Sequence, residues 1–157
     1  MKKGTTFLAG LVAGVILTIL LIATFAPKNT FLVYESKLNF NETVEAIEVS
    51  AKENNWSIPH QYDLQKTMKK HGFEVEPVKV FSMCKPEHAQ KILSGGQERM
   101  ASAMMPCRIA VYERDCKTYF SMLNSGLYSR FMGKNVKSVL SDAAEENIQI
   151  LEPLIKN

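Results

Sequence analysis

The sequence predicts an α+β fold, a two-layer sandwich in which helices pack on one face of a mostly antiparallel sheet. Three observations predict it. Residues 73–84 alternate between apolar and polar side chains, as a half-buried strand does. Residues 107–123 have the pattern of a hairpin made of two such strands. Apolar residues recur at helical spacing in 42–54 and again after residue 136.

The first half of this domain combines a strand with two helices. The β-branched and aromatic residues of 30–40 predict the strand. Asn41 is a favourable N-cap for the amphipathic helix 42–54. Pro59 breaks the helical pattern, because proline disfavours a helical conformation of the residue before it. Asp63 then caps a second, short helix.

The second half begins with the strand 73–84 and continues into a helix whose first turn contains Pro86. The hairpin follows, with strands near 107–113 and 117–123. A last helix starts around Val136 and keeps its helical spacing to the end of the domain. The predicted order is therefore strand, helix, short helix, strand, helix, hairpin and helix.

The N-terminal segment has the composition of a transmembrane helix. Gly4 to Ala26 contain no charged residue, and a spanning helix needs ~20 apolar residues at a rise of about 1.5 Å each. A cleaved signal peptide is the main alternative, but its apolar core is usually only about 7 to 15 residues long. Pro27 would also make a poor cleavage site. A buried helix of a soluble domain is the third interpretation. We expect an uncleaved anchor that contacts the membrane through residues 4–26.

The orientation follows from the flanking charges. Lys2 and Lys3 precede the segment and only Lys28 follows closely, so the short tail should stay in the cytosol. The chain then divides into 1–27, a cytosolic tail with a transmembrane signal-anchor, and 28–157, an exported α+β domain. This predicts a single-pass protein of the inner (cytoplasmic) membrane. Its C-terminal domain would lie outside the cytosol, in the periplasm if the cell is Gram-negative.

Charge and motif patterns exclude two classes of function. Without Lys2 and Lys3 the 19 basic residues fall to 17, against 16 acidic ones. No basic run is interleaved with aromatic residues, so we expect no nucleic-acid partner. No serine, histidine and carboxylate combination has a recognisable nucleophile context, so the sequence does not predict a hydrolase.

Several stretches together resemble a known family. They are "NNWSIP" before "DLQKTMKKHGFEV", then "FSMCKPEHAQKIL", then "MMPCRIAVYERDCKTYFSMLNSGL". A Cys-x-Pro before a helix and a Pro-Cys-Arg that opens a hairpin resemble the domain of unknown function 302 (DUF 302) family, over roughly residues 31–155. The resemblance implies a TBP-like two-layer α+β fold, often dimeric, with no settled activity. The chain departs from the family at the hairpin tip, where Asp115 is followed by Cys116 instead of glycine.

Two cysteines are candidate functional residues. Cys84 ends a predicted strand two residues before Pro86, where the helix N-terminus and the adjacent Lys85 favour a thiolate. Cys107 opens the first strand of the hairpin, and the two thiols approach each other if these strands are neighbours. They can be small buried hydrophobes, a disulfide of an oxidising compartment, or a ligand, metal or redox site.

A metal site at this thiol pair would draw on sulfur ligands. Thiolates and thioethers select Cu(I), and Met83, Met104 and Met105 lie next to the two cysteines. Against this, the chain has no C-x-x-C or H-x-x-x-H spacing, and His88 lies on the following helix. Met83 also alternates to the opposite strand face from Cys84. Methionines at these spacings also fill cores.

The third cysteine, Cys116, falls at the hairpin tip. A two-residue turn favours Asp-Gly there because its central residues need positive φ angles. Either the loop is longer, or an exposed tip tolerates the cysteine. An exposed odd thiol in an exported protein can pair between chains; the alternative is a surface position without a role.

These observations predict binding in preference to catalysis. We expect a membrane-anchored, exported domain of unknown function that binds a small ligand or a partner and works as a homodimer. Its ligand and cofactor cannot be named from the sequence. The alternative is a thiol-dependent redox or soft-metal-handling protein that uses Cys84 and Cys107.

Overall fold

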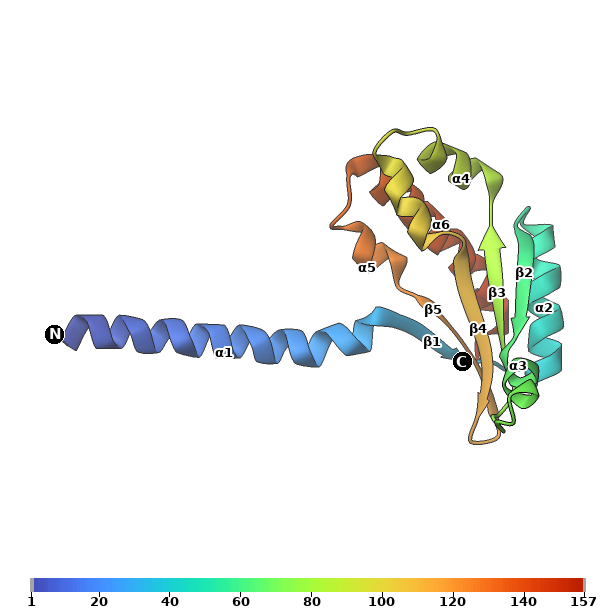
Figure 1. Ribbon diagram of the computed structural model, residues 1–157, viewed down its shortest axis with the longest axis horizontal. Coiled ribbons are helices and arrows are strands. Elements are labelled where there is room, and N and C mark those ends of the chain that lie inside the picture. Colours follow the sequence, from blue (N-terminus) through green and yellow to red (C-terminus); the bar gives the residue numbers. More distant parts are fainter. Residues whose placement is uncertain (1, 157) are drawn as a thin grey trace. The chain divides into compact units, whose positions relative to one another are not determined.

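The computed structural model describes residues 2–156 and divides the chain into two compact units, one ending at Phe31 and the other beginning at Leu32. Strands and helices alternate along the chain (Figure 1). The strands are β1 (Phe31–Glu35), β2 (Ser57–Asp63), β3 (Val78–Cys84), β4 (Cys107–Arg114) and β5 (Lys117–Leu123). The helices are α1 (Lys2–Thr30), α2 (Phe40–Glu53), α3 (Leu64–Lys70), α4 (Pro86–Leu93), α5 (Ser125–Ser129) and α6 (Lys134–Leu151), with the 3-10 helices η1 (Glu98–Met104) and η2 (Glu152–Leu154).

Within the described residues the strands form one five-stranded sheet in the order β1-β5-β4-β3-β2. The pairs β2–β3, β3–β4 and β4–β5 are antiparallel, so the predicted α+β class with an antiparallel sheet is confirmed. The predicted hairpin is β4–β5, which closes at the pair Arg114 and Lys117. Its first strand pairs with β3, and this pairing sets Met83 opposite Cys107.

The main hydrophobic core lies between one face of the sheet and the helices α2 and α6. Every second residue of the central strands points into it, because side chains alternate between the two faces of a strand. The helices contribute residues at helical spacing. This first cluster includes Phe81, Met83, Ile109, Val111, Phe120 and Met122 from the sheet, and Val44, Ile47, Ala51, Ala143, Ile150 and Leu151 from the helices.

A second, smaller cluster joins α4, η1 and the first half of α6. Ile92, Ala101, Val136, Val139 and Leu140 are its buried residues. Met104, Met105 and Met132 pack against it. Because α6 contributes to both clusters, this helix connects the main core to the end of the domain where α4 begins (Figure 1).

The unit that ends at Phe31 contains helix α1. Among the residues that the structure describes, no helix is both long and apolar enough to cross a membrane. The predicted anchor at residues 4–26 is therefore not supported, and this finding contradicts the predicted placement in the inner membrane.

Strand β2 was not predicted, because Pro59 breaks the helical pattern without itself indicating a strand. Proline removes a ladder hydrogen bond, so it is tolerated only on an edge strand or at an irregularity. Both conditions hold here. β2 is the last strand of the sheet, and its register against β3 shifts between Ser57 and His60.

The N-cap of α2 is Asn39, where the sequence had predicted Asn41. The side chain of Asn39 accepts a hydrogen bond from the Glu42 backbone N–H at 3.0 Å, and the Glu42 carboxylate accepts one from the Asn39 backbone N–H at 3.2 Å. This reciprocal capping box satisfies two N–H groups at the helix start. An asparagine three residues before a glutamate, as in Asn39 and Glu42, is therefore a better predictor of this helix start than Asn41 alone.

The hairpin between β4 and β5 turns on two residues. Asp115 has φ 53° and Cys116 has φ 58°, so both occupy the left-handed region that a tight hairpin turn requires. Cys116 is exposed at this tip. Of the two options left open by the sequence, the structure shows the short turn that holds a strained cysteine.

Replacing Cys116 with glycine should therefore stabilise the domain by about 0.5 to 1 kcal/mol, because glycine adopts positive φ without the clash of a Cβ atom. Urea unfolding under reducing conditions measures the change. Cys116→Ala is the matched control, since it removes the thiol but keeps the Cβ atom. Equal stabilisation by both substitutions would show that the turn is not strained at this residue.

Candidate functional site

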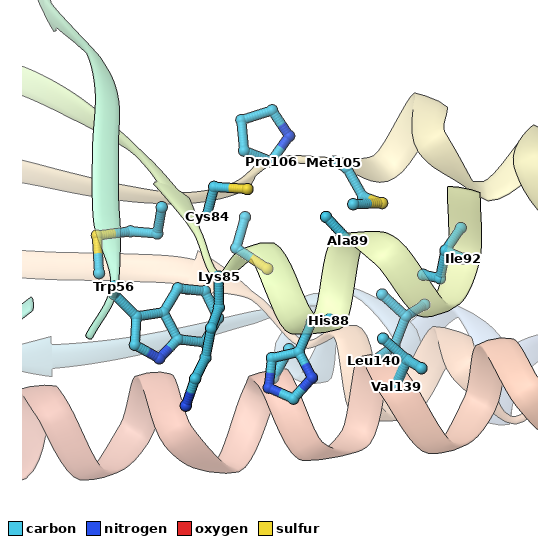
Figure 2. A pocket seen from close by; sticks show the side chains of 13 residues that line it. Trp56, Cys84, Lys85, His88, Ala89, Ile92, Met105, Pro106, Val139 and Leu140 are labelled. Atoms are coloured by element: carbon cyan, nitrogen blue, oxygen red, sulfur yellow. The ribbon is translucent and has the colours of Figure 1, made fainter. Parts of the chain in front are cut away.

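A small cavity lies where the two hydrophobic clusters meet. Its volume is about 30 Å³, enough for one water-sized guest. Figure 2 shows it between the end of β3, helix α4 and helix α6. Its walls are almost entirely apolar or sulfur-bearing. The lining residues are Trp56, Met83, Cys84, Lys85, His88, Ala89, Ile92, Met105, Pro106, Cys107, Val139, Leu140 and Ala143.

Cys84 and Cys107 both line this cavity, so the structure brings the predicted thiol pair together. Met83 lies directly opposite Cys107 in the β3–β4 ladder, and Cys84 is one step further along β3. Both cysteines are half-buried free thiols. Burial raises the pKa of the Cys107 thiol; a hydrogen bond with the Asn147 side chain opposes this, and the neighbouring Cys84 adds to it. Cys107 is thus held as a neutral thiol next to a second sulfur.

Two methionines complete a sulfur-rich wall. Met83 and Met105 both line the cavity together with the cysteines. The sequence placed Met83 and Cys84 on opposite faces of one strand, which would keep them from a common site. β3 ends at Cys84 and α4 begins at Pro86, so strict strand alternation ends at this point. Met104 does not line the cavity and packs against the second cluster instead.

A polar cluster centred on Glu146 borders the cavity. The Glu146 carboxylate accepts hydrogen bonds from Lys85 Nζ at 2.6 Å, Trp56 Nε1 at 2.9 Å and His88 Nε2 at 2.9 Å. Trp56, just before β2, lies far along the chain from Lys85 and His88 at the start of α4, so one carboxylate ties these two segments to α6. Lys85, Trp56 and His88 also line the cavity. The hydrogen bonds to Glu146 therefore fix the positions of the polar side chains in the cavity wall.

The ionised form of Glu146 is favoured here. Burial raises the pKa of this carboxyl, but the hydrogen bonds from Lys85, His88 and Trp56 outweigh it and hold the pKa below its ordinary value. The carboxylate therefore stabilises the fold at pH values above the unfolded-state pKa of about 4.3. This stabilisation is lost as the pH falls through the lower pKa of the folded state.

Wild-type protein should thus lose more stability than Glu146→Gln between about pH 5 and pH 3, because only the wild type has this carboxylate to protonate. Urea midpoints of the two proteins over this pH range measure the difference. Parallel curves would show that the Glu146 charge does not contribute to the stability of the fold.

His88 has a second nitrogen without a partner. The residue is 91 % buried, since its relative exposure is 9 %. Because Nε2 bonds to the Glu146 carboxylate, we assign the proton to Nε2 and a lone pair to Nδ1. Among the described residues Nδ1 is buried and has no hydrogen-bond partner, as is also true of Asn147 Oδ1. Polar groups left in this way are often satisfied by an ordered water or a guest.

The sequence identified part of this site. Cys84, Cys107 and Met105 line the same cavity, while Cys116 is exposed at the hairpin tip and does not line it. Trp56 and Glu146 were missed. They meet across 90 positions of sequence, and no local pattern signals such a contact. In the part of the chain that the structure describes, no three His, Cys, Asp or Glu side chains are grouped to hold a metal ion.

Comparisons with known proteins place the fold. A crystal structure of an uncharacterized conserved protein DUF302 from Bacillus stearothermophilus matches with a TM-score of 0.73 and 19% sequence identity, over 80% of this chain and 98% of that chain. At this identity the likeness shows the fold alone. No match was found among the curated proteins. The model of the family described as "Domain of unknown function DUF302" matches residues 32–156. Since this match spans most of the chain, the protein belongs to the DUF302 family.

Proposed function

We propose that this DUF302 domain is a small-ligand-binding module whose site is the cavity shared by Cys84 and Cys107. The observation that carries the proposal is that two free, half-buried thiols line one cavity. Structural cysteines are usually inert core residues, whereas these two line a cavity. Hydrogen bonds to Glu146 hold three of the lining side chains, Trp56, Lys85 and His88, in position.

The size of the cavity limits the ligand. Pockets for organic ligands are typically about 300 to 1,000 Å³, whereas this cavity has a volume of about 30 Å³. A guest of one or a few atoms fits, and a cofactor-sized molecule does not. Sulfur atoms on the wall favour guests that bind sulfur, so the ligand is best described as a small thiophile.

A second candidate function is dithiol–disulfide exchange, which the proximity of two free thiols favours. One thiolate would attack the disulfide of a substrate and release one of its halves as a thiol, giving a mixed disulfide. The other thiol would then displace the second half, which leaves a Cys84–Cys107 disulfide and a fully reduced substrate. A loss of two hydrogens from the protein, reversed by a dithiol reductant, would identify this reaction.

The homodimer expected from the sequence stays a prediction, since the structure contains one chain. Light scattering coupled to size exclusion tests it.

Reaction with methyl methanethiosulfonate tests whether the thiol pair is open to small thiophiles. Each thiolate takes a thiomethyl group and releases methanesulfinate, so the reagent adds one methylthio unit per cysteine. The protein is the full-length chain with Cys116→Ser, which leaves only Cys84 and Cys107 to react. Trp56 reports on the site, because it is the one tryptophan of the sequence and lines the cavity.

We expect both thiols to react in the folded protein, with a change in Trp56 fluorescence. The rate of global unfolding, measured in parallel after a jump into urea, is the reference. If both thiols react only at that unfolding rate, they are structural core residues and the proposed ligand site does not exist.

A further inference from the structure

Four sulfur-bearing side chains line the cavity at one end of the β3–β4 ladder. Met83 and Cys84 are the last two residues of β3, and Cys107 is the first residue of β4. Met105 precedes Cys107 by two positions, and all four side chains line the same cavity. Met83 is 1 % exposed, whereas the other three are half-buried. The site therefore combines one fully buried sulfur-bearing side chain with three that are partly exposed.

Sulfur donors of this kind select a particular class of ion. Thiolates and thioethers are soft ligands, and among biological metals they favour Cu(I). Oxygen and nitrogen donors are scarce on this wall. Lys85 and His88 bond to Glu146 through Nζ and Nε2, and His88 Nδ1 keeps the unpaired nitrogen lone pair described above. The cavity volume of about 30 Å³ suits a single ion that is held without its hydration shell.

A bound cation would favour the thiolate forms of the two cysteines. Cys84 lies two residues before the first residue of α4, an eight-residue helix whose N-terminal N–H groups carry a partial positive charge. A bound cation between the two sulfur atoms would offset the repulsion between neighbouring thiolates.

We propose that this cavity is a Cu(I) site in which Cys84 and Cys107 bind the ion as thiolates and Met105 adds a thioether. The inference rests on the proposed function and names the class of its ligand. Binding is not a redox step: one Cu(I) ion enters, two thiol protons leave to the solvent, and three Cu–S bonds form, two to the thiolates and one to the Met105 thioether. The metal keeps its oxidation state, so no oxidant or reductant is needed.

An anaerobic competition titration tests the site. Reduced full-length protein competes with bathocuproine disulfonate for Cu(I), and the loss of the coloured Cu(I) complex gives the stoichiometry and affinity. We expect one Cu(I) per chain, with quenching of Trp56 fluorescence at the same equivalence point. Cys84→Ser and Cys107→Ser should each weaken binding by at least about 100-fold, since even outer-shell changes cost 10- to 100-fold.

Two further variants separate ligation from folding. Met105→Leu conserves volume and should preserve the fold, yet it removes a sulfur donor and should weaken Cu(I) binding by about tenfold. Cys116→Ser removes the thiol at the hairpin tip and should leave affinity unchanged, because this residue does not line the cavity. Thermal unfolding of each variant confirms that it is folded.

The outcomes distinguish this inference from the function on which it rests. Unchanged Cu(I) affinity in Cys84→Ser, or loss of affinity in Cys116→Ser, would overturn the Cu(I) site. If both cavity thiols react with methyl methanethiosulfonate but the protein does not compete for Cu(I), the inference fails and the ligand-binding module stands. If the thiols neither react in the folded state nor bind Cu(I), both fail.

Discussion

Replacing Glu146 with alanine is expected to destabilise the domain by about 3 kcal/mol. The substitution removes the acceptor of three hydrogen bonds, two of them from groups that can carry charge, Lys85 and His88. Lys85, whose side chain is 22 % exposed, then loses the carboxylate that it pairs with. Glu146 itself is 31 % exposed, and solvent screening keeps the effect below that of a fully buried ion pair. Urea unfolding of wild type and variant measures the loss.

Two variants of α6 make this prediction specific to the polar cluster. Glu145→Ala changes an exposed carboxylate one residue earlier on the same helix and should alter stability by less than about 0.5 kcal/mol. Glu146→Gln keeps the shape and one carbonyl acceptor, so it should cost about half as much as alanine. Equal effects of Glu145→Ala and Glu146→Ala would contradict the role given to the cluster.

Replacing Ala89 with leucine is expected to slow the reaction of Cys84 and Cys107 with methyl methanethiosulfonate by about 10- to 100-fold, because forcing open an overfilled site costs about 1–3 kcal/mol. Ala89 is half-buried on α4 and lines the cavity. Figure 2 shows its side chain on the side of α4 that faces Met105 and Pro106. The larger side chain therefore occupies the space that a guest would take. The measurement is the rate of methylthio addition in the Cys116→Ser background, followed by mass spectrometry.

Gln90→Leu is the matched control for this variant. Gln90 is the next residue of α4, is exposed and does not line the cavity. The same change in hydrophobicity there should leave the reaction rate as in wild type. A rate that stays unchanged in Ala89→Leu would mean that reagents reach the thiols by a route other than this cavity.

The sheet and the larger helices could be predicted because their signals are local. Alternation in the hairpin strands and helical spacing in 42–54 each involve neighbouring residues, and these elements lie where the patterns predict them. β2 could not be predicted, because Pro59 is compatible with a strand only at the sheet edge, and edge position is a property of the whole fold. The membrane anchor was inferred from the composition of residues 4–26 alone, and no helix of the described residues bears it out.

The candidate site likewise has one part that could be predicted from the sequence and one part that could not. Cys84 and Cys107 could be nominated because each stands at a recognisable boundary, a strand end before Pro86 and the start of a hairpin. Their shared cavity depends on the β3–β4 register, which sequence spacing does not give. Glu146 looked like any charge on the last helix. Its role follows from contacts with Trp56, Lys85 and His88 that lie 58 to 90 positions away.

A native mass spectrum of the full-length protein, purified without chelator or reductant, tests the central claim that Cys84 and Cys107 form one ligand site. The account predicts the mass of the chain plus one small guest, with the added mass absent in Cys84→Ser and retained in Cys116→Ser. A loss of two hydrogens that disappears in Cys84→Ser would favour the dithiol–disulfide function of the same pair. The account would be contradicted if wild type and Cys84→Ser each show only the mass of their own bare chain, with all thiols free and nothing bound.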